Sequence, residues 1–169
     1  TLNQGLYLIE SGSEHFRDQE DHIKKLGVQI QLLKPIIEEY GWKNVYCRKL
    51  LITNKPFSTK LMVEIHQHIH NKPYDLNLID WLEGLINYKE RSSTNDKEKL
   101  IKSKNLTFHR KTDKRFWCSA LVSYIYTKLG YLPINTNWSL ICPEDWNDNH
   151  KFLEFQNCKL DNVKRILEI

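Results

Sequence analysis

The sequence predicts an α+β fold in which a mainly antiparallel sheet packs against a block of helices. Strand-like segments open and close the chain, and segments with a helical spacing of apolar residues lie between them. The chain has 169 residues, of which 40% are hydrophobic, and this is enough for one domain with a sizeable core. We therefore expect a single domain over residues 1–169.

Two strands are predicted near the start of the chain. Residues 6–10 form a β-rich run that Ser11, Gly12 and Ser13 are expected to break. Residues 27–32 alternate with a period of two, which is typical of a strand.

A short helix and a third strand follow. Pro35 is suited to the start of a helix, so we expect a helix over residues 36–40 that ends at Gly41. Residues 44–53 have the composition of a strand, and residues 54–56 predict a turn after it.

Two further helices are predicted in the middle of the chain. Ser58 is a suitable N-cap for a helix that runs to about His70. A second helix is expected from about residue 77 to about residue 88, with Asp75 or Asn77 as its cap.

Residues 116–130 predict an amphipathic helix with Cys118 in its first turn and Gly130 as its stop. The positive end of the helix dipole favours the thiolate of such a cysteine, and so do basic residues just upstream. Cys118 is therefore a candidate nucleophile, and a small hydrophobic residue in a buried turn is the alternative. The apolar stripe consists of Trp117, Leu121, Tyr124, Ile125 and Leu129, and the basic residues are Lys111, Lys114 and Arg115.

The last part of the chain predicts an irregular, packed connection over residues 131–151 and then a closing hairpin from residues 152–156 and 160–169. Two tryptophans of the connection, with a proline between them, are expected to cover the core or to line one wall of a cleft. They are Trp138 and Trp146, with Pro143 between them.

The positive charge of the chain belongs to one segment. Residues 89–115 contain ten Lys or Arg and four Asp or Glu, a net charge of +6, whereas the whole chain has a net charge of only +4. This distribution argues against a globally basic nucleic-acid-binding protein. We interpret residues 89–115 as a basic inserted loop that is solvated, with an anionic partner as the alternative.

The four cysteines, Cys47, Cys118, Cys142 and Cys158, are scattered and show no metal-ligand spacing, so we expect reduced thiols. No apolar run approaches the roughly 20 residues that a membrane span requires. The chain begins at Thr1, and we expect native sequence upstream of it.

Two histidines, His66 and His70, lie four residues apart on a predicted helix, a spacing at which two imidazoles can bind one metal ion. The sequence shows no third ligand and no HExxH pattern, because Glu64 precedes His66. A solvated polar face is the preferred interpretation, so we assign no metal and no cofactor.

Several short motifs occur in an order that resembles one known family. This family is the circularly permuted branch of the NlpC-type papain-like cysteine hydrolases, with YiiX-like amidases and poxvirus relatives among its members and lecithin–retinol acyltransferase-like enzymes as distant ones. The matching segments are Tyr7-Leu8-Ile9-Glu10-Ser11-Gly12, Gly27-Val28, Tyr46-Cys47-Arg48, Asn71-Lys72-Pro73-Tyr74-Asp75 and Trp117-Cys118-Ser119-Ala120-Leu121-Val122.

The resemblance implies a permuted papain-like fold with Cys118 as the nucleophile and Glu10 as the carboxylate that orients a catalytic histidine. The strand that carries this histidine in the family would lie before Thr1. Tyr74, Trp117 and Ser119 belong to the matched motifs, and the resemblance assigns them to binding around the nucleophile.

Two functions follow as expectations. The first is a cysteine hydrolase, namely an amidase, peptidase or acyl-ester hydrolase, that cleaves an amide or acyl-ester substrate through a thioester on Cys118. The alternative is a catalytically silent structural or interaction module with protein partners. The expected reduced thiols indicate a cytoplasmic location, and the resemblance to poxvirus relatives adds a place in the virus particle as the alternative.

Overall fold

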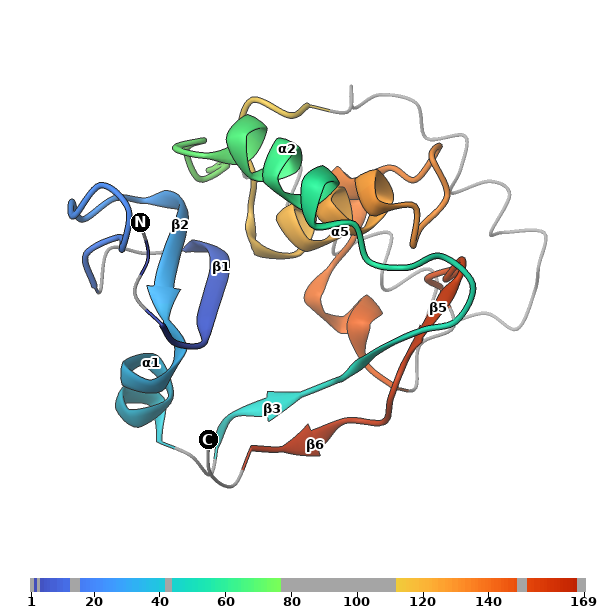
Figure 1. Cartoon of the computed structure of the whole chain (residues 1–169), viewed down its shortest axis with the longest axis horizontal. Helices are drawn as coiled ribbons and strands as arrows, with labels where there is room; N and C mark the ends of the chain where they lie inside the picture. The colour runs from blue at the N-terminus through green and yellow to red at the C-terminus, as the bar shows by residue number, and fades with distance from the viewer. Residues whose placement is uncertain are drawn as a thin grey trace.

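The computed structural model describes residues 2, 4–12, 16–41, 44–76, 112–148 and 152–166. This part of the chain combines three α-helices with small antiparallel sheets, in agreement with the predicted α+β class. Figure 1 shows the strand pair β1–β2 on one side of two neighbouring helices, α2 and α5, with a second strand ribbon below them. The helix predicted over residues 77–88 and the basic segment up to residue 111 lie outside the described residues.

Strands β1 (Tyr7–Gly12) and β2 (Gly27–Leu32) form an antiparallel pair. The predicted bounds of β2 are confirmed, but the predicted break after residue 10 is wrong. Ser11 belongs to β1 because it pairs with Val28 and because its Oγ donates a hydrogen bond to the backbone oxygen of Phe116 at 2.6 Å. Long-range pairing thus outweighs the local preference of Ser and Gly for a turn.

The predicted strand over residues 44–53 is divided into β3 (Tyr46–Cys47) and β4 (Leu50–Ile52). The predicted closing hairpin is wrong. Instead, β5 (Cys158–Leu160) pairs with β4, and β6 (Lys164–Arg165) pairs with β3, both antiparallel. The last strands therefore return to the middle of the chain, where Figure 1 shows β3 and β6 side by side.

The residues between β3 and β4 explain this pairing. The backbone oxygen of Lys49 accepts a hydrogen bond from the backbone nitrogen of Asp161 at 2.8 Å. The Nε of Arg48 donates to the backbone oxygen of Asp161 at 2.8 Å. These bonds join segments more than 100 positions apart, which no local pattern in the sequence indicates.

Gly41 ends the first helix and Ser58 caps the second, both as predicted. Helix α1 (Leu33–Tyr40) begins earlier than predicted and includes Pro35 in its first turn, where a missing N–H costs nothing. It ends at Gly41, whose φ of 76° suits glycine. Helix α2 (Thr59–Ile69) is confirmed, and the Oγ of its N-cap Ser58 accepts a backbone hydrogen bond at 3.2 Å.

Helix α5 (Cys118–Leu129) is also confirmed and ends at Gly130, which has a left-handed φ of 77°. Its apolar residues form the main core together with one face of β1–β2 and with α2. The buried members of this core include Val28, Ile65, Ile69, Phe116, Trp117, Leu121, Tyr124, Leu129 and Trp138.

The predicted irregular connection after α5 is packed. It contains two 3-10 turns, η2 (Trp138–Leu140) and η3 (Pro143–Trp146). The Trp138 ring meets Tyr124 of α5 edge-on, with 5.1 Å between the ring centroids. Tryptophan packing therefore fixes η2 against α5, and residues 149–151 lie outside the described part.

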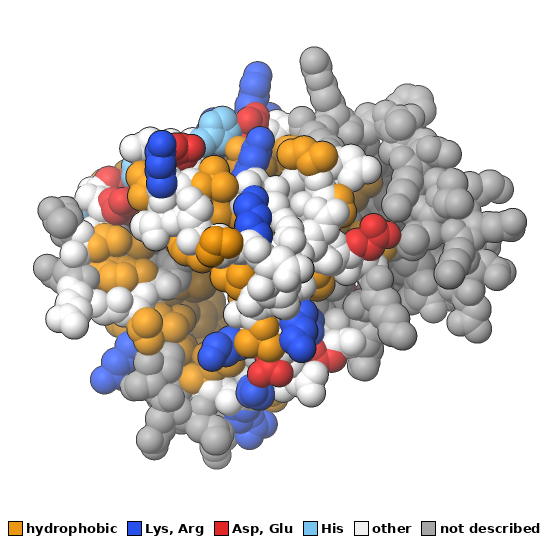
Figure 2. All heavy atoms as spheres, turned by 45° about the vertical axis from the view of Figure 1, so that its right-hand side comes forward, with side chains coloured by type: hydrophobic (Ala, Val, Ile, Leu, Met, Phe, Trp, Pro, Cys, Tyr) orange, Lys and Arg blue, Asp and Glu red, His pale blue; other side chains and the backbone are white. Residues whose placement is uncertain are grey.

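The surface of the described part mixes apolar, basic and acidic side chains. Figure 2 shows hydrophobic and basic side chains interspersed over the middle of one face, with histidine and acidic side chains next to one another at its upper edge. No helix in the described ranges has both the length and the apolar character that a membrane crossing requires.

The loop between β1 and β2 is organised around Asp18, whose exposed fraction is only 1%. Its carboxylate accepts hydrogen bonds from the backbone nitrogens of Glu20 at 2.7 Å, Asp21 at 3.2 Å and Ile30 at 2.8 Å, and Lys25 lies 3.1 Å away. Burial alone raises the pKa of Asp18, but these donors outweigh it and hold the pKa below its ordinary value.

Replacing this aspartate by asparagine (Asp18→Asn) should lower the free energy of unfolding by about 1–3 kcal/mol at pH 7, because several buried donors lose an ionised acceptor. Since the folded-state pKa is depressed, the contribution is present above the unfolded value of about 3.9 and is lost as the pH falls through the folded-state pKa. The difference in free energy of unfolding between Asp18→Asn and the wild type, measured by urea denaturation, should therefore be smaller near pH 3 than at pH 7.

The matched control is Asp21→Asn, which removes a more exposed carboxylate of the same loop and should cost less than about 1 kcal/mol. An Asp18→Asn defect that is equally large at both pH values would contradict the electrostatic account.

Candidate functional site

Cys118 is the first residue of α5, and its side chain is exposed. The residues on either side of it are buried, with exposed fractions of 6% for Trp117 and 5% for Ser119. The thiol is therefore presented to solvent at the end of a helix that is otherwise packed into the core.

The start of α5 offers backbone donors beside this thiol. Trp117 is the N-cap in an extended conformation, and no side chain caps the helix. The first intrahelical hydrogen bond runs from the nitrogen of Leu121 to the oxygen of Trp117 at 3.0 Å, so the N–H groups of residues 118–120 precede the helical ladder. Such N–H groups can bind a negative charge that develops on a reacting oxygen.

The position of Cys118 is fixed by the backbone of Phe116, two residues earlier. The nitrogen of Phe116 donates to the oxygen of Pro73 at 3.1 Å, and its oxygen accepts from the nitrogen of Asp75 at 3.1 Å. The same oxygen accepts the hydrogen bond from Ser11 of β1. Two segments that are far from Phe116 in the sequence, residues 73–75 and β1, thus fix the residue two positions before α5.

The segment 73–75 is itself held by the start of β2. Val28 donates its backbone N–H to the oxygen of Lys72 at 2.8 Å. Gly27 has a φ of 148°, and a Cβ at this position would overlap the backbone oxygen of Lys72 and the backbone of Pro73. Only glycine allows this close approach.

Tyr74 lies near the thiol. Burial raises the pKa of Tyr74, and the charges of Cys118 and Asp75 raise it further. The phenol therefore stays neutral and able to donate a hydrogen bond near Cys118. Tyr74 also packs against the main core, which includes Phe116 and Trp117 just before Cys118.

The other two predicted binding residues lie mainly in the core. The Oγ of Ser119 is 3.9 Å from the Sγ of Cys118, but the Ser119 side chain is buried. The indole of Trp117 packs in the main core, and its Nε1 is buried without a hydrogen-bond partner in the described part of the chain. Both residues therefore pack beneath the exposed thiol, on the core side of the start of α5.

Glu10 points away from this site. Its Oε1 accepts a hydrogen bond from the Nε2 of Gln29 at 3.0 Å. Side chains alternate along a strand, so Glu10 and its partner Gln29 occupy the face of β1–β2 opposite Ser11, which faces Phe116. The structure does not bring Glu10 to the thiol of Cys118.

The histidines of the described part also lie elsewhere. The Nε2 of His68 is 2.8 Å from the Oδ2 of Asp113, and its ring stacks on Tyr124 with 5.9 Å between centroids. His66 and His70 both approach Glu20, and His22 lies in the β1–β2 loop with a φ of 61°. None of these four side chains contacts Cys118. His15, His109 and His150 lie outside the described residues.

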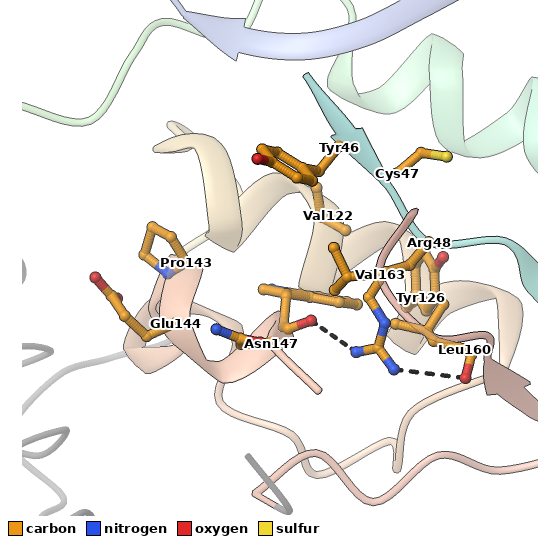
Figure 3. Close-up of a pocket in the computed structure, with 11 residues that line it drawn as sticks. Tyr46, Cys47, Arg48, Val122, Tyr126, Pro143, Glu144, Asn147, Leu160 and Val163 are labelled. Carbon is orange, nitrogen blue, oxygen red and sulfur yellow. Dashed lines mark hydrogen bonds between the residues drawn. The ribbon is translucent and has the colours of Figure 1, made fainter. Parts of the chain in front are cut away.

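A cavity of about 510 Å³ lies along the same side of α5 as Cys118. Val122 and Tyr126 line it, and they follow Cys118 at intervals of four residues, which places all three on one face of the helix. Figure 3 shows Tyr46, Val122 and Val163 grouped together among the residues that line this cavity. The complete lining is Tyr46, Cys47, Arg48, Val122, Tyr126, Pro143, Glu144, Trp146, Asn147, Leu160 and Val163.

The lining is mainly apolar, although Glu144, Asn147 and Arg48 add polar groups. The phenol of Tyr126 is neutral, because burial raises its pKa to about 12, with smaller contributions from Cys158 and Tyr131 and an opposing one from Arg48. Of the two tryptophans that were expected to cover the core or to line a cleft, Trp146 lines this cavity and Trp138 belongs to the main core.

Arg48 holds the walls of the cavity together. Its guanidinium donates to the backbone oxygens of Trp146 at 2.7 Å and Leu160 at 3.4 Å, as Figure 3 shows, besides that of Asp161. It also forms an ion pair with Asp148 at 3.0 Å. In the sequence Arg48 stood out only as part of a matched motif. No local pattern indicated that it would link residues 146–148 and 160–161 to its own segment.

Replacing Gly27 by alanine (Gly27→Ala) should lower the free energy of unfolding by at least about 2 kcal/mol, because the added Cβ clashes with backbone and the φ is unfavourable. Gly12→Ala in β1 is the matched control, since its Cβ would meet only the flexible carboxylate of Glu10 at 3.3 Å. Equal losses for the two variants in urea denaturation would show that Gly27 is not required.

Truncation of the guanidinium side chain (Arg48→Ala) should cost about 2–4 kcal/mol, because it leaves several carbonyl acceptors and Asp148 without their donor. Arg48→Lys should recover only part of this loss, since an ammonium cannot reproduce the planar fork of donors. Full recovery in Arg48→Lys, measured by thermal and urea denaturation, would show that the charge alone matters.

Comparison of the chain with protein-family models, with curated proteins and with solved structures finds no match. The function must therefore be argued from the residues and their geometry, together with the motif order described above.

Proposed function

We propose that the chain is a cysteine hydrolase of the permuted papain-like type, acting on an amide or acyl-ester bond through a thioester on Cys118. The observation that carries the proposal is the exposed thiol of Cys118 between two buried neighbours at the start of α5. A cysteine that served only as a small hydrophobic residue would be buried, as Cys142 and Cys158 are.

The arrangement of the matched motifs supports the same proposal. The segments 27–28, 71–75 and 117–119 meet around the start of α5 through the hydrogen bonds of Lys72, Pro73 and Phe116. Three of the five matched segments are therefore neighbours in space, as residues of one active site would be.

In the proposed reaction the Cys118 thiolate attacks the carbonyl carbon of the substrate, and the carbonyl oxygen becomes negatively charged. The N–H groups at the start of α5 and the neutral phenol of Tyr74 are the described donors for this oxygen. The amine or alcohol leaves with a proton from the base, and water then hydrolyses the thioester to release the acid and the thiol.

The base of this reaction is a histidine that the resemblance places upstream of Thr1. The orienting role of Glu10 stays a prediction, and its hydrogen bond to Gln29 also gives it a place in the β1–β2 pair. The cavity below Cys118 is the proposed site for the larger part of the substrate, and its mainly apolar lining favours an apolar or aromatic group there.

The alternative function is a catalytically silent structural or interaction module. It is favoured by one specific observation, which is that neither Glu10 nor any of the four described histidines contacts Cys118. The resemblance to poxvirus relatives is compatible with either function in the cytoplasm or in a virus particle. An anionic partner for residues 89–115 stays a prediction, since most of that segment lies outside the described residues.

The proposal is tested by alkylation with iodoacetamide across a range of pH, on the longest native chain, with labelling sites read by peptide mass spectrometry. Cys118 should react faster than Cys47, which is the other exposed cysteine, and Cys142 and Cys158 should react only after unfolding. A nitrophenyl acyl ester should then give an acyl adduct on Cys118, detected as a mass increase.

The matched controls are Cys118→Ser and Cys47→Ser. The fast phase and the acyl adduct should disappear in the first variant and persist in the second. If Cys118 reacts no faster than Cys47 and no acyl adduct forms, the hydrolase proposal is wrong and the interaction module is preferred.

A further inference from the structure

Three potential metal ligands converge on the side of α2 that faces the β1–β2 loop. The Oε2 of Glu20 lies 2.9 Å from the Nε2 of His66 and 3.1 Å from the Nδ1 of His70. The three donor atoms all lie within 4.8 Å of one another. We propose that Glu20, His66 and His70 form a binding site for a divalent transition-metal ion, with Zn²⁺ as its preferred occupant.

The structure supplies the third ligand that the sequence lacked. His66 and His70 lie one helical turn apart on α2, so that both imidazoles project from the same side. Glu20 comes from the β1–β2 loop, 46 positions before His66. This carboxylate enters the cluster only because the loop folds against α2, which explains why the spacing of the histidines alone gave no metal site.

The loop is built to hold Glu20 in this place. The backbone nitrogen of Glu20 donates to the buried carboxylate of Asp18, which also binds Ile30 of β2. Lys25 bonds to Asp21 at 2.8 Å and to the side chain of Asn71, just after α2. The ligand therefore comes from an anchored turn, and the other two acidic residues of that turn, Asp18 and Asp21, are already paired with Lys25.

The distances fit the preferred geometry of zinc. Zn²⁺ binds imidazole nitrogens and carboxylate oxygens at about 2.0–2.2 Å with tetrahedral angles, so two of its ligand atoms lie about 3.3 Å apart. The two glutamate–histidine distances are within a few tenths of an ångström of this value. The Nε2 of His66 and the Nδ1 of His70 lie within 4.8 Å of each other, so modest side-chain adjustments would bring all three donor atoms to this spacing.

The chemistry of the donor set selects the class of metal. Two imidazoles and one carboxylate suit Zn²⁺ and neighbouring transition metals, whereas Ca²⁺ and Mg²⁺ require mainly oxygen ligands. A cavity of about 350 Å³ lies over the cluster and leaves room for a water molecule in a fourth position. Figure 2 shows histidine and acidic side chains together at the upper edge of the molecular surface.

Zn²⁺ in this site would connect the β1–β2 loop to α2. Ser11 of β1 holds Phe116, the residue two positions before Cys118, and both β1 and α2 contact α5. A link between the β1–β2 loop and α2 would therefore stabilise the elements that surround Cys118. The inference does not depend on the hydrolase proposal, because the ligands are separate from Cys118 and Tyr74.

The test is a titration of tag-free, metal-stripped protein with Zn²⁺, in a Cys47→Ser, Cys118→Ser background so that exposed thiols cannot bind the ion. Isothermal titration should show one ion bound per chain. At free Zn²⁺ about 100-fold above Kd, the melting temperature should rise by about 5–10 °C. Co²⁺ should give the visible absorption of a tetrahedral site, and Mg²⁺ should give no effect.

Glu20→Gln, His66→Gln and His70→Gln should each weaken Zn²⁺ binding at least tenfold and remove most of the stabilisation. His68→Gln is the matched control, because this histidine lies on the same helix but bonds to Asp113 on another side. Circular dichroism without metal shows whether each variant is folded. If Zn²⁺ does not bind, or if it binds the variants as tightly as the parent, the cluster is an ion pair only and the proposal is overturned.

Discussion

The backbone of Phe116 is the point at which the described structure is joined together. It exchanges hydrogen bonds with Pro73 and Asp75 and accepts one from Ser11, while its side chain is completely buried in the core. Because α5 begins two residues later, these bonds fix both the direction of the helix and the position of Cys118. Buried backbone groups are costly to leave unpaired, so this arrangement is strongly specified once the segments meet.

A second constraint sets the position of the β1–β2 loop. The carboxylate of Asp18 is buried and serves as the acceptor for backbone groups on both sides of the loop. A charge can remain in such a place only because donors surround it, and these donors give the loop one conformation. The cluster of Glu20 with two histidines of α2 is a consequence of that conformation, as is the proposed metal site.

One face of α5 carries both the candidate nucleophile and a cavity. Near its start lie the thiol of Cys118, free backbone donors and the phenol of Tyr74, and along the same face lies a largely apolar cavity whose walls Arg48 connects. This combination of a reactive group, donors for an anion and an adjoining cavity is what acyl-transfer chemistry needs. Among the described residues neither a histidine nor Glu10 contacts Cys118, so the base and the orienting carboxylate of the proposed hydrolase stay predictions.

Local elements of this protein were predictable from the sequence, and long-range ones were not. The bounds of β2, the caps of α2 and the start and stop of α5 follow from residues a few positions apart, because periodicity, Ser58 and Gly130 act locally. Cys118 became a candidate nucleophile from its place in the first turn of a predicted helix, whereas Tyr74 became a candidate through the motif order of the resemblance. The partners of β3 and β4, the direction of Glu10, the cavity and the third ligand of the histidine cluster were decided by tertiary structure alone. Each of these depends on contacts between distant segments, such as Arg48 with Asp161 or Glu20 with His66, and such contacts form only when the core brings the segments together.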